Sequence, residues 1–181
     1  MTLIKDIINQ NKRLANISKA ISELSDETKI NAFLVGGCVR DLMLNPSEEA
    51  IDVDIMVEGN GIDFAKKLAK KINVRKIVPF EKFATAKIPY SEFEIEVASA
   101  RLEKYEESSR NPSEVVISKI DDDLLRRDFT VNAMAISLNK DNFGEFFDPF
   151  NGMKDLSNKI LRTPLDSDIT CLLYTSPSPR D

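Results

Sequence analysis

The chain has 181 residues, carries a formal net charge of −5 and contains no histidine. A chain of this length normally forms one domain of roughly 100–200 residues, and its 42% apolar and 30% charged residues are typical of a globular protein. Without histidine, Ser-His-Asp triads and histidine metal ligands are excluded, so a bound metal would need oxygen ligands, as Mg²⁺ does. The acidic balance argues against an extended nucleic-acid surface in this segment.

Two further features limit the class of protein. Cys38 and Cys171 lack the spacing of a disulfide framework or a zinc site. The N-terminus lacks the apolar core of a signal peptide, and no run approaches the ~20 apolar residues that span a bilayer. We therefore expect a cytoplasmic protein with no membrane partner, and composition leaves its oligomeric state open.

The first half of the chain is predicted to alternate helices with strands, because its apolar residues recur at helical spacing in some stretches and in runs or strict alternation in others. Glycine and proline pairs separate these stretches. The predicted helices cover 3–24, 39–44 and the segment after Gly61, and the predicted strands cover 32–35 and 51–57. Residues 1–30 form a separate N-terminal helical segment in this interpretation.

The second half is predicted to contain three more strands, at 74–78, 84–88 and 93–98. The charged residues 101–114 indicate a mobile loop. The acidic run 121–123 favours a helix start, continued by helix and then strand over 124–135, and residues 148–152 form a turn. The fold class is therefore α+β (mixed α/β), with antiparallel neighbours in the sheet.

The last eleven residues, 171–181, differ from the rest of the chain. Serine and proline crowd together with no apolar period, so this segment cannot continue a packed element. One interpretation is a disordered tail. We prefer the hypothesis that 171–181 is not native sequence, because it resembles translated sequencing adapter or a frameshift.

Asp52-Val53-Asp54 is the first candidate for chemistry. On a strand these two carboxylates point to the same side, with Cα atoms ~6.5–7 Å apart. Two acids so placed can converge on metal ions ~3.5–4 Å apart that activate a hydroxyl and stabilise a leaving pyrophosphate. The alternative is a solvated strand face. Glu96 is a candidate third acid if its strand lies beside this one.

Gly36-Gly37 and Arg40 form a second candidate group. Glycines between a strand and a helix start let backbone N–H groups approach a phosphate, which the helix N-terminus also favours. Arg40, in the first turn of that helix, would add a charge-assisted bond to the same phosphate. The alternative is a glycine turn with a surface arginine. For Cys38, beside this turn, packing is the preferred interpretation.

Arg126-Arg127-Asp128 is the third group. Two arginines beside one acid are suited to phosphate or nucleotide, with the acid orienting them; the alternative is a surface ion pair. Asn132 follows Asp128 by four residues, so a helix would place both on one face. Its amide is suited to a ribose hydroxyl or a base, or to capping a strand.

These groups together resemble a known family. Residues 34–42 (LVGGCVRDL) with Asp52-Val53-Asp54 resemble the first signature of the class II CCA-adding enzyme and bacterial poly(A) polymerase family. Residues 126–135 (RRDFTVNAMA) resemble its second signature, and 148–163 resemble the segment that follows. The order and spacing of these signatures make the resemblance specific over about residues 33–170.

The resemblance implies a DNA polymerase beta-like nucleotidyltransferase head over 31–170, with Mg²⁺ held by Asp52 and Asp54 and with Glu96 as the third acid. It implies CTP, ATP and the tRNA 3′ end as partners, in CCA addition. The residues it implies for nucleotide binding are Gly36, Gly37, Arg40, Arg101, Arg127, Asp128 and Asn132. The charged segment near Tyr105 and 110–112 resembles the family's flexible loop.

The chain departs from the family pattern after Thr170, where an acidic-Asp-Pro-Leu-Arg segment and a helical body normally follow. The family's choice between C and A resides in that segment, so the sequence leaves nucleotide choice open and predicts a truncated protein. Poly(A) polymerase and an enzyme adding only C or only A remain alternatives, because they share these motifs. An inactive nucleotide-binding fragment is the alternative of another class.

Overall fold

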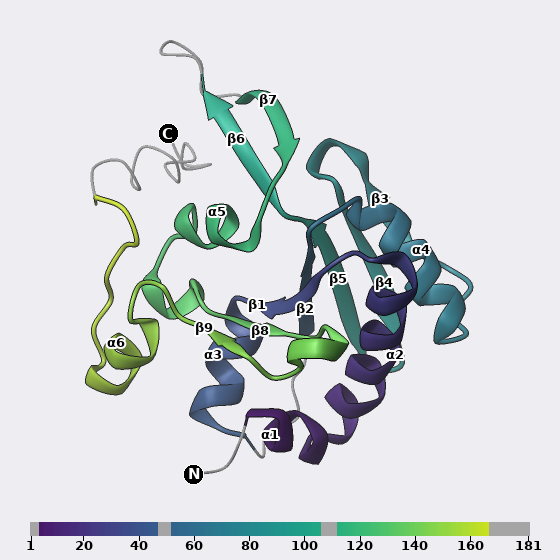
Figure 1. Ribbon diagram of the computed structural model, residues 1–181, viewed down its shortest axis with the longest axis horizontal. Coiled ribbons are helices and arrows are strands. Elements are labelled where there is room, and N and C mark those ends of the chain that lie inside the picture. The colour runs from purple at the N-terminus through teal and green to yellow at the C-terminus, as the bar shows by residue number, and fades with distance from the viewer. Residues whose placement is uncertain (1–3, 47–51, 106–111, 167–181) are drawn as a thin grey trace, which may run out of the picture.

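A seven-stranded mixed sheet forms the centre of the computed structural model, which describes residues 4–46, 52–105 and 112–166. The strand order is β3-β4-β5-β2-β1-β8-β9, and helices flank the sheet (Figure 1). β2 and β5 pair in parallel, and the other neighbouring strands pair antiparallel. The predicted α+β class, with a mainly antiparallel sheet, is therefore confirmed.

The elements follow one another along the chain without internal repetition. The strands of the sheet are β1 (Ala32–Val35), β2 (Asp52–Val57), β3 (Val78–Phe80), β4 (Thr85–Tyr90), β5 (Phe93–Ser99), β8 (Ala135–Ser137) and β9 (Phe146–Phe147). The α-helices are α1 (Ile4–Gln10), α2 (Lys12–Thr28), α3 (Gly37–Leu44), α4 (Gly61–Lys71), α5 (Ile120–Leu125) and α6 (Gly152–Asn158). The 3₁₀ turns are η1 (Glu81–Phe83), η2 (Thr130–Asn132) and η3 (Lys140–Asn142).

The alternation of side chains decides which face of β2 and β5 is buried. Val53, Ile55 and Val57 enter the main hydrophobic core, where they meet the apolar faces of α2 and α4. Met56 points to the other side and joins a second, smaller core with Leu124 of α5. The acidic residues of β2 and β5 therefore share their face of the sheet with α5.

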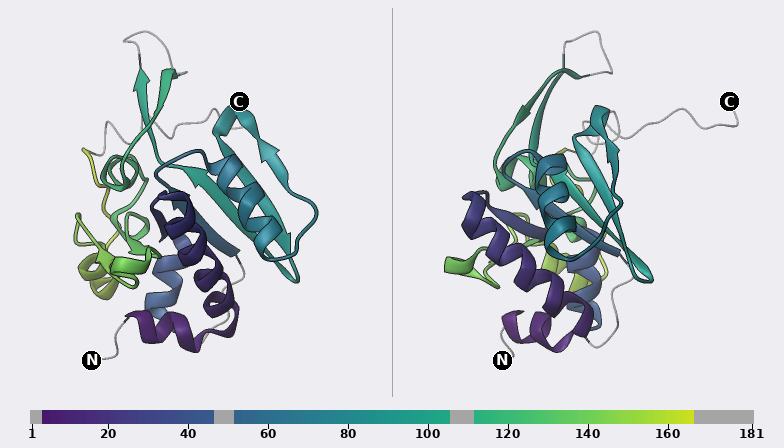
Figure 2. Two further views of the ribbon diagram at one scale, coloured as in Figure 1. Left: turned by 45° about the vertical axis from the view of Figure 1, so that its right-hand side comes forward. Right: turned by 90° about the vertical axis from the view of Figure 1, so that its right-hand side faces the viewer.

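The N-terminal segment contains two helices where one was predicted over 3–24. Asn11 ends α1 and caps α2, because its side-chain oxygen accepts a 3.2 Å hydrogen bond from the amide of Leu14. Both helices contribute buried side chains to the main core; α1 packs against α2, and α2 packs beside α4 on one face of the sheet (Figure 2).

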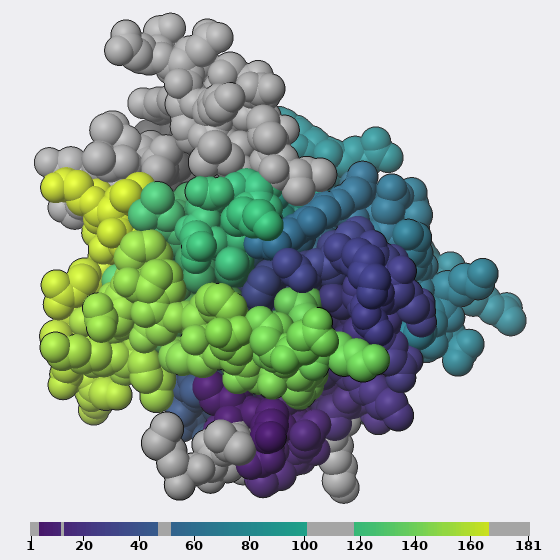
Figure 3. Space-filling model, viewed as in Figure 1, coloured from purple at the N-terminus to yellow at the C-terminus, as the bar shows by residue number. Residues whose placement is uncertain are grey.

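A loop from the C-terminal part of the chain covers these helices. Ser25 Oγ donates a 2.8 Å hydrogen bond to Asn139 Oδ1, and Lys140 pairs with Asp26. Gly144, with a φ of 84°, lies against the backbone of Lys5. In the space-filling view this green loop lies directly over the purple N-terminal helices (Figure 3).

Three predicted elements were wrong. The strand over 74–78 is absent, since β3 begins only at Val78; the chain leaves α4 through the left-handed Asn73 (φ 60°). The loop predicted over 101–114 instead contains β6 (Arg101–Tyr105) and β7 (Pro112–Ile117), an antiparallel ribbon that projects from the sheet (Figure 2). The helix predicted to continue into 124–135 ends at Leu125 and is followed by η2, and the strand predicted after it, β8, begins at Ala135.

Within the described ranges, no helix is long and apolar enough to cross a membrane. The segment 171–181, with Cys171, lies outside the described residues, as does the centre of the charged loop at 106–111.

Candidate active site

A cleft of about 490 Å³ opens on the face of the sheet that carries α5. It lies between the turn that joins β1 to α3, the strands β2, β4 and β5, and the segment from α5 to η2. Most of the site residues predicted from sequence line it: Gly36, Gly37, Arg40, Asp54, Glu96, Arg127, Asp128 and Asn132. Residues from three distant parts of the chain therefore meet at one place.

Asp54 and Glu96 form the acidic floor of the cleft. They are register partners on the parallel strands β2 and β5. Burial, and then the negative charge of Glu96, raise the pKa of the Asp54 carboxyl above its usual value, while the Arg127 guanidinium acts in the opposite direction. From the sequence, Glu96 was a candidate third acid only if its strand lies beside that of Asp54. The structure meets this condition.

Asp52 occupies a different position. It begins β2 opposite Glu94, is exposed to solvent, and is not among the residues that line the cleft. Its negative charge still contributes to the raised pKa of Asp54. Lys87 lies on this side too, 3.0 Å from Glu94 and 3.7 Å from Glu96.

The donor set of this floor fits a hard divalent cation. It offers carboxylate oxygens, the ligands that Mg²⁺ prefers. Burial and then the charge of Glu96 raise the Asp54 pKa, and a bound cation would offset the repulsion between the two carboxylates. Among the described residues no three acidic or sulfur side chains are already gathered around one point. Asp54 and Glu96 are therefore the residues placed to hold a cation, with Asp52 at the edge.

Gly36 separates the acidic floor from the basic wall. It has a φ of 71° and caps α3, whose Arg40 amide donates a 3.1 Å hydrogen bond to its carbonyl. A Cβ at this position would lie 2.8 Å from Arg127 Nη1 and 3.6 Å from Asp54 Oδ2. Only glycine meets both the left-handed backbone and this close approach. At Gly37 the added Cβ would make only an ordinary contact, 3.5 Å from Arg40 Nη2.

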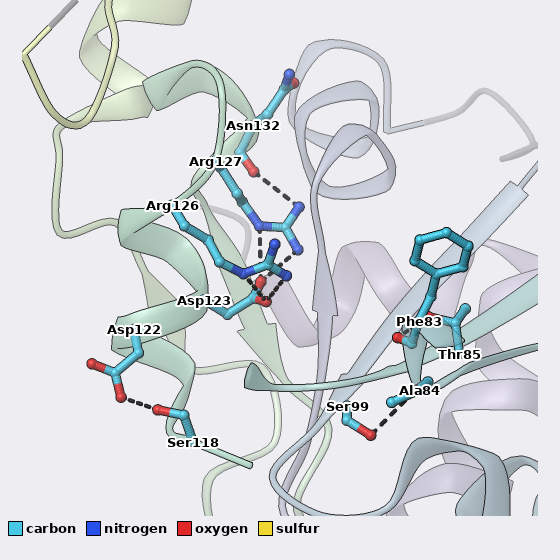
Figure 4. A network of polar contacts seen from close by, with 10 residues as sticks. All are labelled: Phe83, Ala84, Thr85, Ser99, Ser118, Asp122, Asp123, Arg126, Arg127 and Asn132. Atoms are coloured by element: carbon cyan, nitrogen blue, oxygen red, sulfur yellow. Dashed lines mark hydrogen bonds and ion pairs between the residues drawn. The ribbon is translucent and has the colours of Figure 1, made fainter. Parts of the chain in front are cut away.

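Arg126 and Arg127 form the basic wall, and both are held by Asp123 (Figure 4). Arg126 bonds one carboxylate oxygen through Nε and Nη2, and Arg127 bonds the other through the same two atoms. Asp128, predicted as the orienting acid, instead accepts from the amide of Phe129 at 2.7 Å. The acid that pairs with both guanidinium groups is thus Asp123, and the helix expected to continue past it ends at Leu125.

A chain of three side chains joins the glycine helix to the second motif. Arg40 Nη1 donates to Asn132 Oδ1 at 2.7 Å, and Asn132 Nδ2 donates to Asp128 Oδ1 at 3.0 Å. Arg40 also pairs with Asp41 at 2.8 Å. Asp128 and Asn132 interact as their spacing suggested. They do so around the 3₁₀ turn η2, which ends at Asn132, and not along one face of an α-helix.

Sequence reasoning missed several residues of the cleft, among them Asp123, Phe83 and Thr85. Asp123 was counted only as part of an acidic helix start, although its spacing of three and four from the two arginines was the signal. Phe83 of η1 lines the opposite wall together with Thr85, and its side chain is 53% exposed (Figure 4). No pattern in the sequence marked it.

Two other predicted residues stand apart. Cys38 is buried, and burial raises the pKa of its thiol to about 12, which agrees with the expected packing role. Arg101 begins β6, but its side chain lies outside the part of the chain that the structure describes, as do Tyr105 and 110–111.

Comparison with known proteins gives one family. The model of the poly A polymerase head domain matches residues 32–162. The A-adding tRNA nucleotidyltransferases of Aquifex aeolicus and Geobacter sulfurreducens are 43% and 39% identical over 74% and 78% of this chain, and each match covers 16% of the relative. A CCA-adding enzyme of Lactobacillus helveticus is 33% identical over 79% of this chain and 33% of the relative.

Solved structures agree with this. A CCA-adding enzyme in an apo form superposes with a TM-score of 0.80 at 34% identity, over 96% of this chain and 41% of that one. A tRNA nucleotidyltransferase complexed with a primer tRNA and an incoming ATP analog gives a TM-score of 0.67 at 37% identity, over 80% and 39% of the two chains. The chain thus spans about a sixth to two fifths of the proteins it resembles.

Proposed function

Because this chain belongs to the poly A polymerase head domain family, we propose that it is the catalytic head of an enzyme that adds nucleotides to the 3′ end of tRNA. The reaction transfers CMP or AMP from CTP or ATP and releases pyrophosphate. One observation carries the proposal: Gly36 lies between Arg127 and Asp54, so a basic wall and an acidic floor face the same small space.

The basic wall is suited to the triphosphate. Arg126 and Arg127 offer planar guanidinium groups, which bind phosphate oxygens in pairs. Gly36 and Gly37 allow the backbone at the start of α3 to approach the same phosphates. Arg40 and Arg101 are assigned to nucleotide binding on the family pattern alone, and so is the contact of Asp128 and Asn132 with the ribose.

The acidic floor is suited to a metal ion. The family generally uses a divalent metal, and we assign Mg²⁺ to Asp54 and Glu96, with Asp52 as the further ligand. When bound, such an ion lowers the pKa of a coordinated hydroxyl and neutralises charge on the phosphates.

The reaction is an in-line displacement. The 3′-hydroxyl oxygen of the RNA forms a bond to the α-phosphorus, the bond from that phosphorus to the bridging oxygen breaks, and pyrophosphate leaves with the bond electrons. The hydroxyl proton passes to water. The side chains of the cleft contribute mainly by holding the triphosphate for this attack and by stabilising the charge that develops.

Addition of A alone is a second candidate, which the names of the relatives favour. The relatives at 43% and 39% identity are A-adding enzymes, whereas the CCA-adding relative is 33% identical. The site residues assigned above do not distinguish the two activities, because each is assigned to the phosphates, the ribose or the metal.

The test is to incubate the full-length protein with Mg²⁺, CTP or ATP, and tRNA that ends before the first C, after C, or after CC. Incorporation of both nucleotides in order supports CCA addition, and incorporation of A on the CC end alone supports A addition. Extension of arbitrary RNA with ATP would identify a poly(A) polymerase. Nucleotide binding without transfer would identify an inactive fragment. Asp54→Ala should abolish transfer, whereas Asp63→Ala, exposed on α4, should retain it.

A further inference from the structure

We propose that Asp123 is a positioning residue of this site, whose buried carboxylate fixes Arg126 and Arg127 in the orientation that receives a triphosphate. The inference rests on the proposed function, since it assigns a role within the same cleft. Asp123 touches neither phosphate nor metal in this role, and acts only through the two arginines.

The first argument is the geometry of the three side chains. Asp123 Oδ1 accepts from Arg126 Nε at 3.1 Å and Nη2 at 2.5 Å. Its Oδ2 accepts from Arg127 Nε at 3.2 Å and Nη2 at 2.9 Å. Each arginine is therefore held by Asp123 through Nε and Nη2, and in Arg127 Nη1 donates a longer hydrogen bond of 3.5 Å to the carbonyl oxygen of Asn132. In Arg127 that nitrogen is the atom beside Gly36.

The second argument is burial. The side chain of Asp123 is 1% exposed, while those of Arg126 and Arg127 are 30% and 22% exposed. A buried carboxylate is costly unless it is paired and hydrogen-bonded. Asp123 is thus fixed in the protein interior, and the arginines extend from it toward the cleft, as Figure 4 shows.

The third argument is charge. One carboxylate between two guanidinium groups reduces their mutual repulsion and leaves one net positive charge on these three side chains. A polyphosphate needs that remaining charge. Two arginines held in advance also bind it without first losing side-chain freedom. The spacing of three and four residues places both arginines one turn after Asp123, at the end of α5.

The test uses the full-length protein and two probes, ATP and inorganic triphosphate. Asp123→Asn keeps the size of the side chain but loses its charge, and we expect the Kd of both probes to rise about 10-fold or more. Asp121→Asn, an exposed carboxylate on the same helix, should change either Kd less than about 2-fold. In an Arg127→Gln background the effect of Asp123→Asn on the Kd should shrink several-fold, because Asp123 can then influence the ligand only through Arg126. Equal losses in both backgrounds, or no loss, would overturn the inference.

A variant-free measurement covers the case in which Asp123→Asn does not fold. NMR of the nucleotide-free protein should find the guanidinium groups of Arg126 and Arg127 slow in rotation about the Nε–Cζ bond and their Nε–H protons protected from exchange. Freely rotating guanidinium groups would overturn the inference. If the wild-type protein binds triphosphate in a way that depends on Asp123 but transfers no nucleotide, the proposed function alone is overturned. Transfer that is indifferent to Asp123→Asn would overturn this inference alone, and a wild type that neither binds nor transfers would overturn both.

Discussion

Arg40 donates a 2.7 Å hydrogen bond from Nη1 to Oδ1 of Asn132, although 92 positions separate them in the chain. The bond joins the glycine helix α3 to the turn that carries the second motif. Because Asn132 also donates to Asp128, one amide fixes a cation and an anion at the edge of the cleft.

Replacing Asn132 should therefore release both charged side chains. In Asn132→Ala we expect the KM for ATP to rise about tenfold, since a hydrogen bond to a charged group is worth about 1.5–3 kcal/mol and 1.4 kcal/mol is a factor of ten. Steady-state transfer to tRNA measures this. Asn16→Ala, exposed on α2, is the matched control, and an unchanged KM in Asn132→Ala would contradict the linking role.

Gly36→Ala should be far more damaging than Gly37→Ala. At Gly36 the new Cβ meets Arg127 Nη1 at 2.8 Å and the backbone has a φ of 71°. The left-handed backbone alone costs a residue with a Cβ roughly 1–2 kcal/mol, and Arg127 must also move. We expect Gly36→Ala to lower both the melting temperature and ATP affinity, as followed by calorimetry and by titration. Equal effects at the two glycines would show that the close approach is unimportant.

Asp54→Asn should separate stability from activity. Burial and the charge of Glu96 raise the Asp54 pKa above its value in the unfolded chain, so ionisation is disfavoured in the folded protein. That penalty appears as the pH rises through the folded-state pKa, and it is absent below the unfolded value. In the presence of EDTA the variant should thus have a higher melting temperature than the wild type at neutral pH and lose this advantage in acid. Assayed with Mg²⁺ and tRNA, its transfer activity should be about 100-fold or more lower.

Asp155 should show the opposite pH dependence. It accepts from Thr130 Oγ1 at 2.8 Å and from Arg162 Nε at 3.0 Å, and these bonds hold its pKa below the usual value. The stability it contributes is present above the unfolded pKa and is lost as the pH falls through the lowered folded value. Asp155→Asn should melt earlier than wild type at pH 7 but not in strong acid. The exposed Asp141→Asn is the control, and a constant difference at all pH values would argue against the ion pair.

Local pattern was enough to predict the elements that build the floor of the cleft. The alternation of Asp52, Val53, Asp54 and Ile55 predicts a half-buried strand with both acids on one side. β2 has this form at its start, whereas its last residues are buried on both faces. The run before Gly36 likewise predicted β1 and its turn. The alternation succeeds because one face of β2 enters the main core, whereas the unbroken apolar run of β1 reflects burial of both of its faces.

Pattern failed where short elements depend on contacts distant in sequence. The segment 124–135 has apolar residues suited to a helix, but Leu124 and Ala135 are drawn into the second core from opposite ends. The chain between them turns through η2, and Gly152 of α6 packs so closely that a Cβ there would lie 2.2 Å from the carbonyl of Thr130. Propensity over a few residues cannot outweigh such packing.

The sequence by itself determined the chemistry of the site: oxygen ligands without histidine, paired acids on one strand, a glycine turn and a pair of arginines. Only the tertiary structure decided how these parts meet. The parallel pairing of β2 with β5 places Glu96 beside Asp54, and the end of α5 at Leu125 assigns the arginines to Asp123 and not to Asp128. The physical reason is that side-chain type is local, whereas strand pairing and helix ends follow from burial summed over the whole core.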